Sequence, residues 1–323
     1  MSRARITLLN LLTVVAALLA CIGIALTERA PARAALTHQT DAHEVTDADG
    51  TVVPVRSYQR IGSFSPIADV VLLETVAPTR IIGLAGTMRD GLGSHRFEGI
   101  RSIDGARVEE VLALNPDLII VSGMSDAGHV RQLRDAGVQV FRLGEMRGLS
   151  TFARDARLVS ALVDASGAGA QLATSLERRM RMVAADIPLS RRPRALYLGV
   201  MGRGLYGGAQ HTSYHDVLIA AGLRDALDHM DGWPELTPEQ VLAMDPDVVV
   251  LHQGTRGLLC QRDGFATMRA CRGLAGTQVV ELPSGILNDP GLGMLPCAEQ
   301  LRTAVHGAPP RIPQSPTEPS DHD

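Results

Sequence analysis

Short apolar runs alternate with amphipathic segments along most of this chain. The runs predict buried strands at 80–84, 118–121, 138–143, 194–200, 248–251 and 278–282. The segments between them predict helices at 108–114, 129–136, 214–221 and 238–243. Strands that alternate with helices are typical of parallel sheets covered by helices.

One of these helix–strand elements occurs twice. Residues 108–122 return as residues 238–252, with Val-Leu-Ala and Pro-Asp at the same relative positions. Pro116 and Pro246 each end the helix, because proline cannot donate to the helical hydrogen-bond ladder. The strands at 80–84 and 194–200 are expected to be counterparts in the same way. Two such copies predict two similarly built lobes with a cleft between them.

The lobes are predicted at 52–150 and 186–307, and a helical connector at 151–185 joins them. The connector contains no proline, and its apolar residues recur at helical spacing. Gly167 and Gly169 mark an expected break near its middle. A helix of this length would extend roughly 45 Å at about 1.5 Å per residue. We therefore expect a long, rigid connecting helix that permits only modest closure of the cleft.

The N-terminal segment is typical of export. Arg3 and Arg5 precede an apolar run over residues 6–26, and small residues at 32 and 34 predict a signal peptide spanning residues 1–34. A lipid anchor at Cys21 and an uncleaved membrane anchor are the alternatives. Each places the folded part outside the cytoplasm, and we expect a periplasmic protein. Residues 35–51 are expected to form a flexible leader, and the Pro-rich residues 308–323 a disordered tail.

Charge and cysteine content narrow the class further. The net charge of −4 and the absence of a dense basic stripe argue against binding of nucleic acid. An oxidising compartment permits disulfides. Cys260 and Cys271 are the preferred pair, although Cys297 leaves the pairing open.

These features together resemble a known family. The export signal, the lobe–helix–lobe order, the repeated Pro-Asp element and the Trp-Pro-Glu-Leu-Thr-Pro-Glu-Gln sequence at 233–240 are similar to substrate-binding proteins of ABC importers. These are the helical-backbone, class III receptors for iron–siderophore complexes, vitamin B12 and haem. The resemblance covers residues 52–307. It implies a monomer that delivers a metal chelate to a membrane permease, with iron–siderophore ranked first, cobalamin second and haem third. It implies no enzymatic activity, catalytic residue, cofactor or resident metal.

The resemblance also implies an acidic residue on each lobe that engages arginines of the permease. Asp69 and Asp216 lie at the matching positions, near the starts of predicted helices. Separated anions on one face would set the orientation of docking. The alternative is that both carboxylates stabilise helix N-termini.

The ligand is expected at the carboxyl ends of the parallel strands, where loops of both lobes face the cleft. Aromatic rings there would offer flat contact area, imidazole or phenol groups could ligate a metal, and arginines could bind carboxylates. An ordinary surface role is the alternative for each. The candidate ligand-binding residues are Arg89, His95, Met124, Tyr206, His211, Tyr214, Trp233, His252 and Asn288.

Two other functions compete with this hypothesis. Gly202–Gly207 matches the GxGxxG pattern, and Asp225 lies where a ribose-binding acid would fall, which indicates an exported nucleotide-dependent enzyme. A divalent-metal receptor of related architecture is the second competitor. Its ligands would come from His95, His129, His211 and Asp289.

Overall fold

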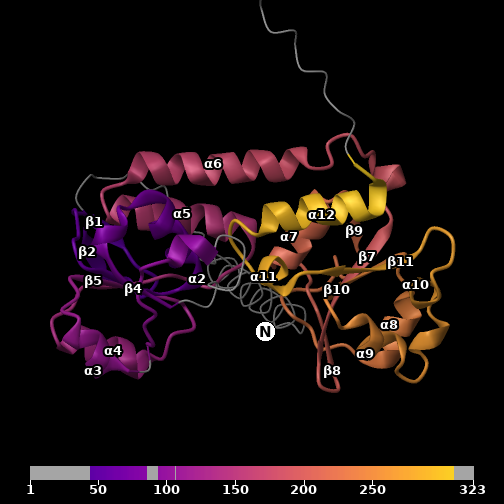
Figure 1. Ribbon diagram of the computed structural model, residues 1–323, viewed down its shortest axis with the longest axis horizontal. Helices are drawn as coiled ribbons and strands as arrows, with labels where there is room; N and C mark the ends of the chain where they lie inside the picture. Colours follow the sequence, from indigo (N-terminus) through magenta and orange to yellow (C-terminus); the bar gives the residue numbers. More distant parts are fainter. Residues whose placement is uncertain (1–43, 86–93, 106, 309–323) are drawn as a thin grey trace, which may run out of the picture. The chain divides into compact units, whose positions relative to one another are not determined.

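The computed structural model describes residues 44–85, 94–105 and 107–308. All of them belong to one compact unit of the chain (Figure 1). The predicted signal peptide, Cys21, Arg89 and the tail from residue 309 lie outside the described residues. None of the described helices is both long and apolar enough to cross a bilayer.

The N-terminal lobe contains a four-stranded parallel sheet in the order β4-β3-β5-β6. Its central strand β5 is buried along its whole length, as expected of an apolar run covered on both faces. The strands are β3 (Ile61–Phe64), β4 (Ile81–Leu84), β5 (Leu118–Val121) and β6 (Val140–Arg142). The helices are α2 (Pro66–Thr75), η1 (Pro78–Arg80), η2 (Ser94–Phe97), α3 (Val108–Ala113) and α4 (Ala127–Asp135).

The C-terminal lobe repeats this order as β9-β7-β10-β11, again parallel, and β8 adds an antiparallel hairpin to β7. The strands are β7 (Arg194–Met201), β8 (Gly204–Gly207), β9 (Arg224–Asp225), β10 (Val248–His252) and β11 (Gln278–Leu282). The helices are η3 (Leu189–Arg191), α7 (Ser213–Ala220), α8 (Pro238–Met244), α9 (Arg256–Cys260), η4 (Phe265–Thr267), α10 (Arg269–Arg272), α11 (Ser284–Leu287) and α12 (Met294–His306).

The repeated Pro-Asp element has the same structural role in both lobes. The Asp117 carboxylate accepts a 2.9 Å hydrogen bond from the backbone N–H of Arg60, just before β3. The Asp247 carboxylate accepts a 2.9 Å bond from the backbone N–H of Arg194, at the start of β7. Each aspartate thus bonds the turn to the neighbouring strand. The repeated sequence therefore corresponds to the same strand pairing in both lobes, β3 with β5 and β7 with β10.

The counterpart of β7 is β3, and the expected correspondence between residues 80–84 and 194–200 is wrong. β3 pairs with β5 as β7 pairs with β10, whereas residues 81–84 occupy the position of β9. The sequence Ile-Gly-Ser-Phe of β3 lacks a continuous apolar pattern, so β3 was missed. A Cβ atom at Gly62 would lie 2.5 Å from the Ile119 side chain, which explains the small residue there.

The N-terminal lobe begins earlier than predicted. β1 (Glu44–Thr46) and β2 (Val52–Pro54) form an antiparallel hairpin, with Val45 and Val53 buried in the core. Between the strands, the buried Asp47 carboxylate pairs with Arg134 of α4 at 2.8 Å. Residues 44–51 are therefore part of the lobe and not of a leader.

The connector is helical with the expected break near its middle, although the break lies at residues 163–165, just before Gly167, and divides the connector into two helices. α5 (Leu149–Leu162) and α6 (Ser166–Met182) pack against each other and are separated by a turn in which Asp164 has a φ of 62°. α5 packs against α2 of the N-terminal lobe. Toward one end α6 contacts α2 and α5, and toward the other end it contacts α7 and α12; its 17 residues extend about 26 Å. The helix that spans both lobes (Figure 1) is thus α6 alone.

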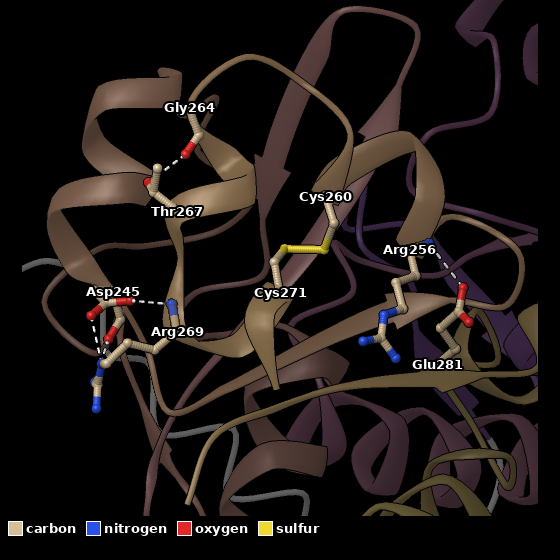
Figure 2. The surroundings of a disulfide bond; sticks show 8 residues. All are labelled: Asp245, Arg256, Cys260, Gly264, Thr267, Arg269, Cys271 and Glu281. Atoms are coloured by element: carbon tan, nitrogen blue, oxygen red, sulfur yellow. Dashed lines mark hydrogen bonds and ion pairs between the residues drawn. A yellow bond between two sulfur atoms is a disulfide. The ribbon is translucent and has the colours of Figure 1, made fainter. Parts of the chain in front are cut away.

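A disulfide joins Cys260 and Cys271 across η4, the pair preferred from the sequence (Figure 2). Beside it, the guanidinium of Arg269 donates to the Asp245 carboxylate at 2.6 Å. Cys297 is a buried free thiol in α12, and burial raises its pKa to about 12. Such a thiol is protonated and inert at neutral pH.

Candidate functional site

A cavity of about 450 Å³ is lined by both lobes. The N-terminal lobe contributes the segments that follow β3, β5 and β6 together with one residue of α5, whereas the C-terminal lobe contributes Trp233 and Pro290. This is the edge at which ligands bind in parallel sheets. The N-terminal lining consists of Phe64, Ser65, Pro66, Ile67, Ser122, Gly123, Met124, Ser125, Leu143, Gly144, Glu145, Met146 and Asp155.

Most of this lining is apolar. Met124 is 93% exposed and Trp233 45% exposed, although both are large apolar side chains. Exposed apolar groups beside a cavity are typical of a binding surface. Met124 and Trp233 were both predicted ligand-binding residues, and the structure brings them to the same cavity.

A buried carboxylate also lines the cavity. The Asp155 side chain is 1% exposed, and its Oδ1 accepts from Nε and Nη2 of Arg154 at 2.9 and 2.8 Å. Burial raises the pKa of Asp155 to about 6, against the opposing effect of Arg154. No feature of the sequence marks Asp155, because one acid in an amphipathic helix looks like a surface position.

A cluster of rings lies in the C-terminal lobe. Tyr197 and Tyr214 stack with centroids 3.7 Å apart, and the Tyr197 hydroxyl bonds His252 Nε2 at 2.9 Å. The other imidazole nitrogen bonds Ser284 Oγ at 3.2 Å, and the Tyr214 hydroxyl donates to Asn288 Oδ1 at 3.1 Å. Burial lowers the pKa of His252, so its ring is neutral at neutral pH.

This ring cluster unites three of the predicted residues, namely Tyr214, His252 and Asn288. Asn288 lies two residues before Pro290, which lines the cavity. Tyr197 was missed because it lies inside the apolar strand β7. A polar aromatic residue within a buried run was the available signal, since its hydroxyl requires a partner.

A third group of side chains connects the lobes beside Trp233. His211 Nδ1 bonds the Asp231 carboxylate at 2.7 Å, and this bond lowers the pKa of Asp231. Arg147, from the loop before α5, lies 3.8 Å from Asp231 and 3.0 Å from Glu145. His211 is thus oriented by Asp231, and it is not among the residues that line the cavity.

The remaining predicted ligand-binding residues are dispersed. His95 is exposed in η2, and neither it nor Tyr206 lines the cavity. Tyr206 lies in β8, where it forms a bridge with Glu235. Arg89 lies outside the described residues.

The nucleotide-binding alternative is wrong. Gly202 and Arg203 form the tight turn of the β7–β8 hairpin, and Gly204–Gly207 is an antiparallel strand. A dinucleotide site requires the glycines to lead into a helix N-terminus that faces the phosphates. Asp225 instead accepts from His215 Nδ1 at 2.7 Å, which raises the pKa of that histidine.

The divalent-metal alternative is not supported either. Across residues 44–85, 94–105 and 107–308, no three His, Cys, Asp or Glu side chains come close enough to hold a metal ion. Asp289 accepts from the backbone N–H groups of Gly291 and Gly293 at 2.7 and 2.9 Å. It therefore shapes the loop before α12, and does not converge with His95, His129 and His211.

Of the two predicted docking carboxylates, Asp69 is buried and Asp216 is half-buried. Asp69 is 0% exposed within α2. The Asp216 carboxylate accepts a 2.6 Å bond from the backbone N–H of Leu149, and burial raises its pKa despite that bond. Asp216 thus caps the N-terminus of α5 from the other lobe. Docking requires exposed anions, so the burial of Asp69 and the bond of Asp216 to Leu149 weigh against this role, which stays a prediction for both residues.

Comparisons with known proteins agree with this architecture. The chain is 21% identical over 206 residues to an uncharacterized ABC transporter substrate-binding lipoprotein, YvrC, of Bacillus subtilis, which covers 62% of this chain. It is 25% identical over 260 residues, 77% of its length, to a cobalamin-binding protein of Halobacterium salinarum. The chain spans 65% and 69% of the lengths of these two relatives.

Solved structures share the fold. The periplasmic heme-binding protein RhuT of Roseiflexus matches with a TM-score of 0.65 at 21% identity, covering 77% of this chain and 98% of that one. A possible iron-binding protein of Staphylococcus epidermidis matches with a TM-score of 0.64 at 17% identity, covering 77% and 99%. The family model for periplasmic binding proteins matches residues 78–284. With this match and the two-lobed architecture, the chain belongs to the periplasmic binding protein family.

Proposed function

We propose that this protein is the extracytoplasmic capture component of an ABC importer, which holds a metal-chelate nutrient between its lobes and delivers it to a permease. The observation that carries the proposal is the cavity lined by the strand ends of the N-terminal lobe and by Trp233 and Pro290 of the C-terminal lobe. Capture and release require no covalent step, and we expect a monomer. Asp69 is buried and Asp216 bonds Leu149, so this proposal does not depend on either as a docking group.

Among chelates, we propose a ligand whose metal is already fully coordinated. We rank a corrinoid above an iron–siderophore complex as this ligand. The hydroxyls of Tyr197 and Tyr214 and both imidazole nitrogens of His252 already have hydrogen-bond partners, so they are not poised to ligate a metal. The charged side chains among the described lining residues are the carboxylates Glu145 and Asp155, which disfavour an anionic ligand. The relative named as cobalamin-binding supports the same choice. Because a corrinoid exceeds the cavity in size, one edge of it would enter.

Haem is the second candidate, and His211 is the observation that favours it. Asp231 engages Nδ1 of this imidazole, which orients the ring and leaves Nε2 as the nitrogen available to a metal. A shifted Soret band on addition of hemin, lost in His211→Ala, would support haem as the ligand.

The first experiment is native mass spectrometry and visible spectroscopy of the protein purified from its own host, followed by calorimetric titration with cyanocobalamin and hemin. We expect a corrinoid mass and spectrum, and cyanocobalamin binding that is weakened at least about 30-fold by Trp233→Ala, since buried tryptophans dominate binding energy. Met201→Ala, which removes an exposed apolar side chain outside the cavity, is the control. Failure of every chelate to bind would refute the proposed function.

A further inference from the structure

We propose that Asp155 is a ligand-recognition residue that accepts a hydrogen bond from a neutral amide N–H group at the edge of the chelate. This inference rests on the proposed function and specifies which part of the ligand enters the cavity. It assigns a binding role to a residue that has no sequence signal of its own.

The position of Asp155 is the first support. It is the one charged residue among the buried residues of α5, whose other buried positions are apolar, serine or threonine. It also lines the cavity, together with Met146 and with Trp233 of the other lobe. An ionised group in such surroundings is costly unless it is paired or has a ligand to meet.

The hydrogen bonding of Asp155 is the second support. Arg154 occupies Oδ1 with two N–H groups. Oδ2 is buried and has no hydrogen-bond partner among the described residues. A carboxylate accepts through both oxygens, so half of its capacity remains for a donor that arrives in the cavity. Glu145, the other acid of the lining, is exposed and pairs with Arg147, so it lacks this property.

The charges around Asp155 select the kind of donor. A ligand carboxylate would be repelled, and it would bring an acceptor where a donor is needed. A second cation would lie beside the guanidinium of Arg154, which already neutralises the pair. A neutral N–H group avoids both conflicts. The raised pKa of Asp155 agrees with a carboxylate that lacks sufficient donors before the ligand binds.

The test compares cyanocobalamin with the separate isomers in which one peripheral amide is hydrolysed to a carboxylic acid. We expect the wild-type protein to bind at least one isomer about tenfold or more weakly than the parent, because that isomer puts an anion against Asp155. Asp155→Asn should bind the parent about tenfold more weakly and lose the discrimination against that isomer, since its amide can donate to the acid.

Two further variants separate recognition from a structural role. Asp155→Leu should lose the parent and the sensitive isomer together, because it offers neither acceptor nor donor. Asp117→Asn, which removes the same charge at the opposite end of β5, should keep both affinities within about twofold of wild type. The inference would be overturned if Asp155→Asn bound every isomer as weakly as the wild-type protein binds the sensitive one, or if its affinities equalled those of the wild-type protein. Either result would leave the proposed function standing. Failure of the wild-type protein to bind any of these corrinoids would overturn both.

Discussion

The two lobes share one strand order but differ in the side chains at the carboxyl ends of their strands. At equivalent strand positions, the N-terminal lobe has Ser63 and Ser122, whereas the C-terminal lobe has Tyr197 and His252. The C-terminal groups bond one another and form a preorganised surface. The N-terminal face is apolar and contains Asp155, whose Oδ2 has no partner among the described residues. A duplicated scaffold has thus diverged at the strand ends while the Pro-Asp turns that align its strands were kept.

The largest expected effect on stability comes from a substitution at Gly148, where the two lobes meet. Gly148 has φ 75° and ψ −155°, a region that is essentially restricted to glycine, and a Cβ atom there would lie 2.1 Å from Asp216 Oδ2. Gly148→Ala should therefore lower the free energy of unfolding by about 4 kcal/mol, from backbone strain and overpacking together. Urea denaturation measures this loss.

Gly254→Ala is the matched control for that variant. Gly254 has a similar φ of 84°, but nothing lies within 4 Å of the added Cβ atom. Its cost should be about 1 kcal/mol. Equal losses in the two variants would show that the contact with Asp216 does not hold the lobes together.

The second largest expected effect is on the pH dependence of stability, and it comes from the buried Asp155 carboxylate of the N-terminal face. Burial raises the pKa of Asp155 to about 6 from an ordinary value of 3.8, so the folded state binds its proton more tightly than the unfolded state. The stabilisation is present below the unfolded pKa and is lost as the pH rises through the folded pKa. A shift of about 2 pKa units corresponds to about 3 kcal/mol.

Asp155→Asn should therefore gain up to about 3 kcal/mol over the wild-type protein between pH 4 and pH 7. Urea denaturation at several pH values measures the difference between the two proteins. A constant difference across this range would mean that Asp155 ionises normally, and that the N-terminal face contains no strained carboxylate.

The smallest effect concerns the C-terminal ring cluster. Tyr197→Phe keeps the ring stacked on Tyr214 but removes the bond to His252, so the protein should lose about 1 kcal/mol of stability. The pKa of His252, followed by NMR, should rise if the hydroxyl donates to the neutral ring. Tyr206→Phe in β8 removes a hydroxyl outside the cluster and is the control. An unchanged His252 pKa would argue that this face is not preorganised by its hydrogen bonds.

The sequence predicted the fold better than the site. Apolar runs and the repeated Pro-Asp element correctly indicated two lobes with helix-covered parallel sheets, because burial on both faces leaves a strong local pattern. Among the site residues, Met124, Trp233, Tyr214, His252 and Asn288 lie at the cavity or in the ring cluster. Met124 and His252 follow predicted strands, whose ends fix where these side chains lie, whereas Tyr214 begins a predicted helix and Trp233 and Asn288 lie in loops.

Where the prediction failed, the decisive neighbour was distant along the chain. The strand β3 has a weak pattern, and its pairing with β5 places it at the centre of the sheet. Asp216 looks like an ordinary helix-start acid until Leu149, 67 residues earlier, uses its carboxylate as a cap.

By itself, the sequence determined the class of fold, the duplication and the likeness to a family of binding proteins, because these depend on periodicity and on turns within a few residues. The tertiary structure alone decided that Asp155 is buried against the cavity, that Tyr197 joins His252, and that Asp69 is inaccessible. Whether a polar group is buried, and which group it bonds, depends on packing between segments that are distant along the chain. Such contacts produce no local pattern in the sequence.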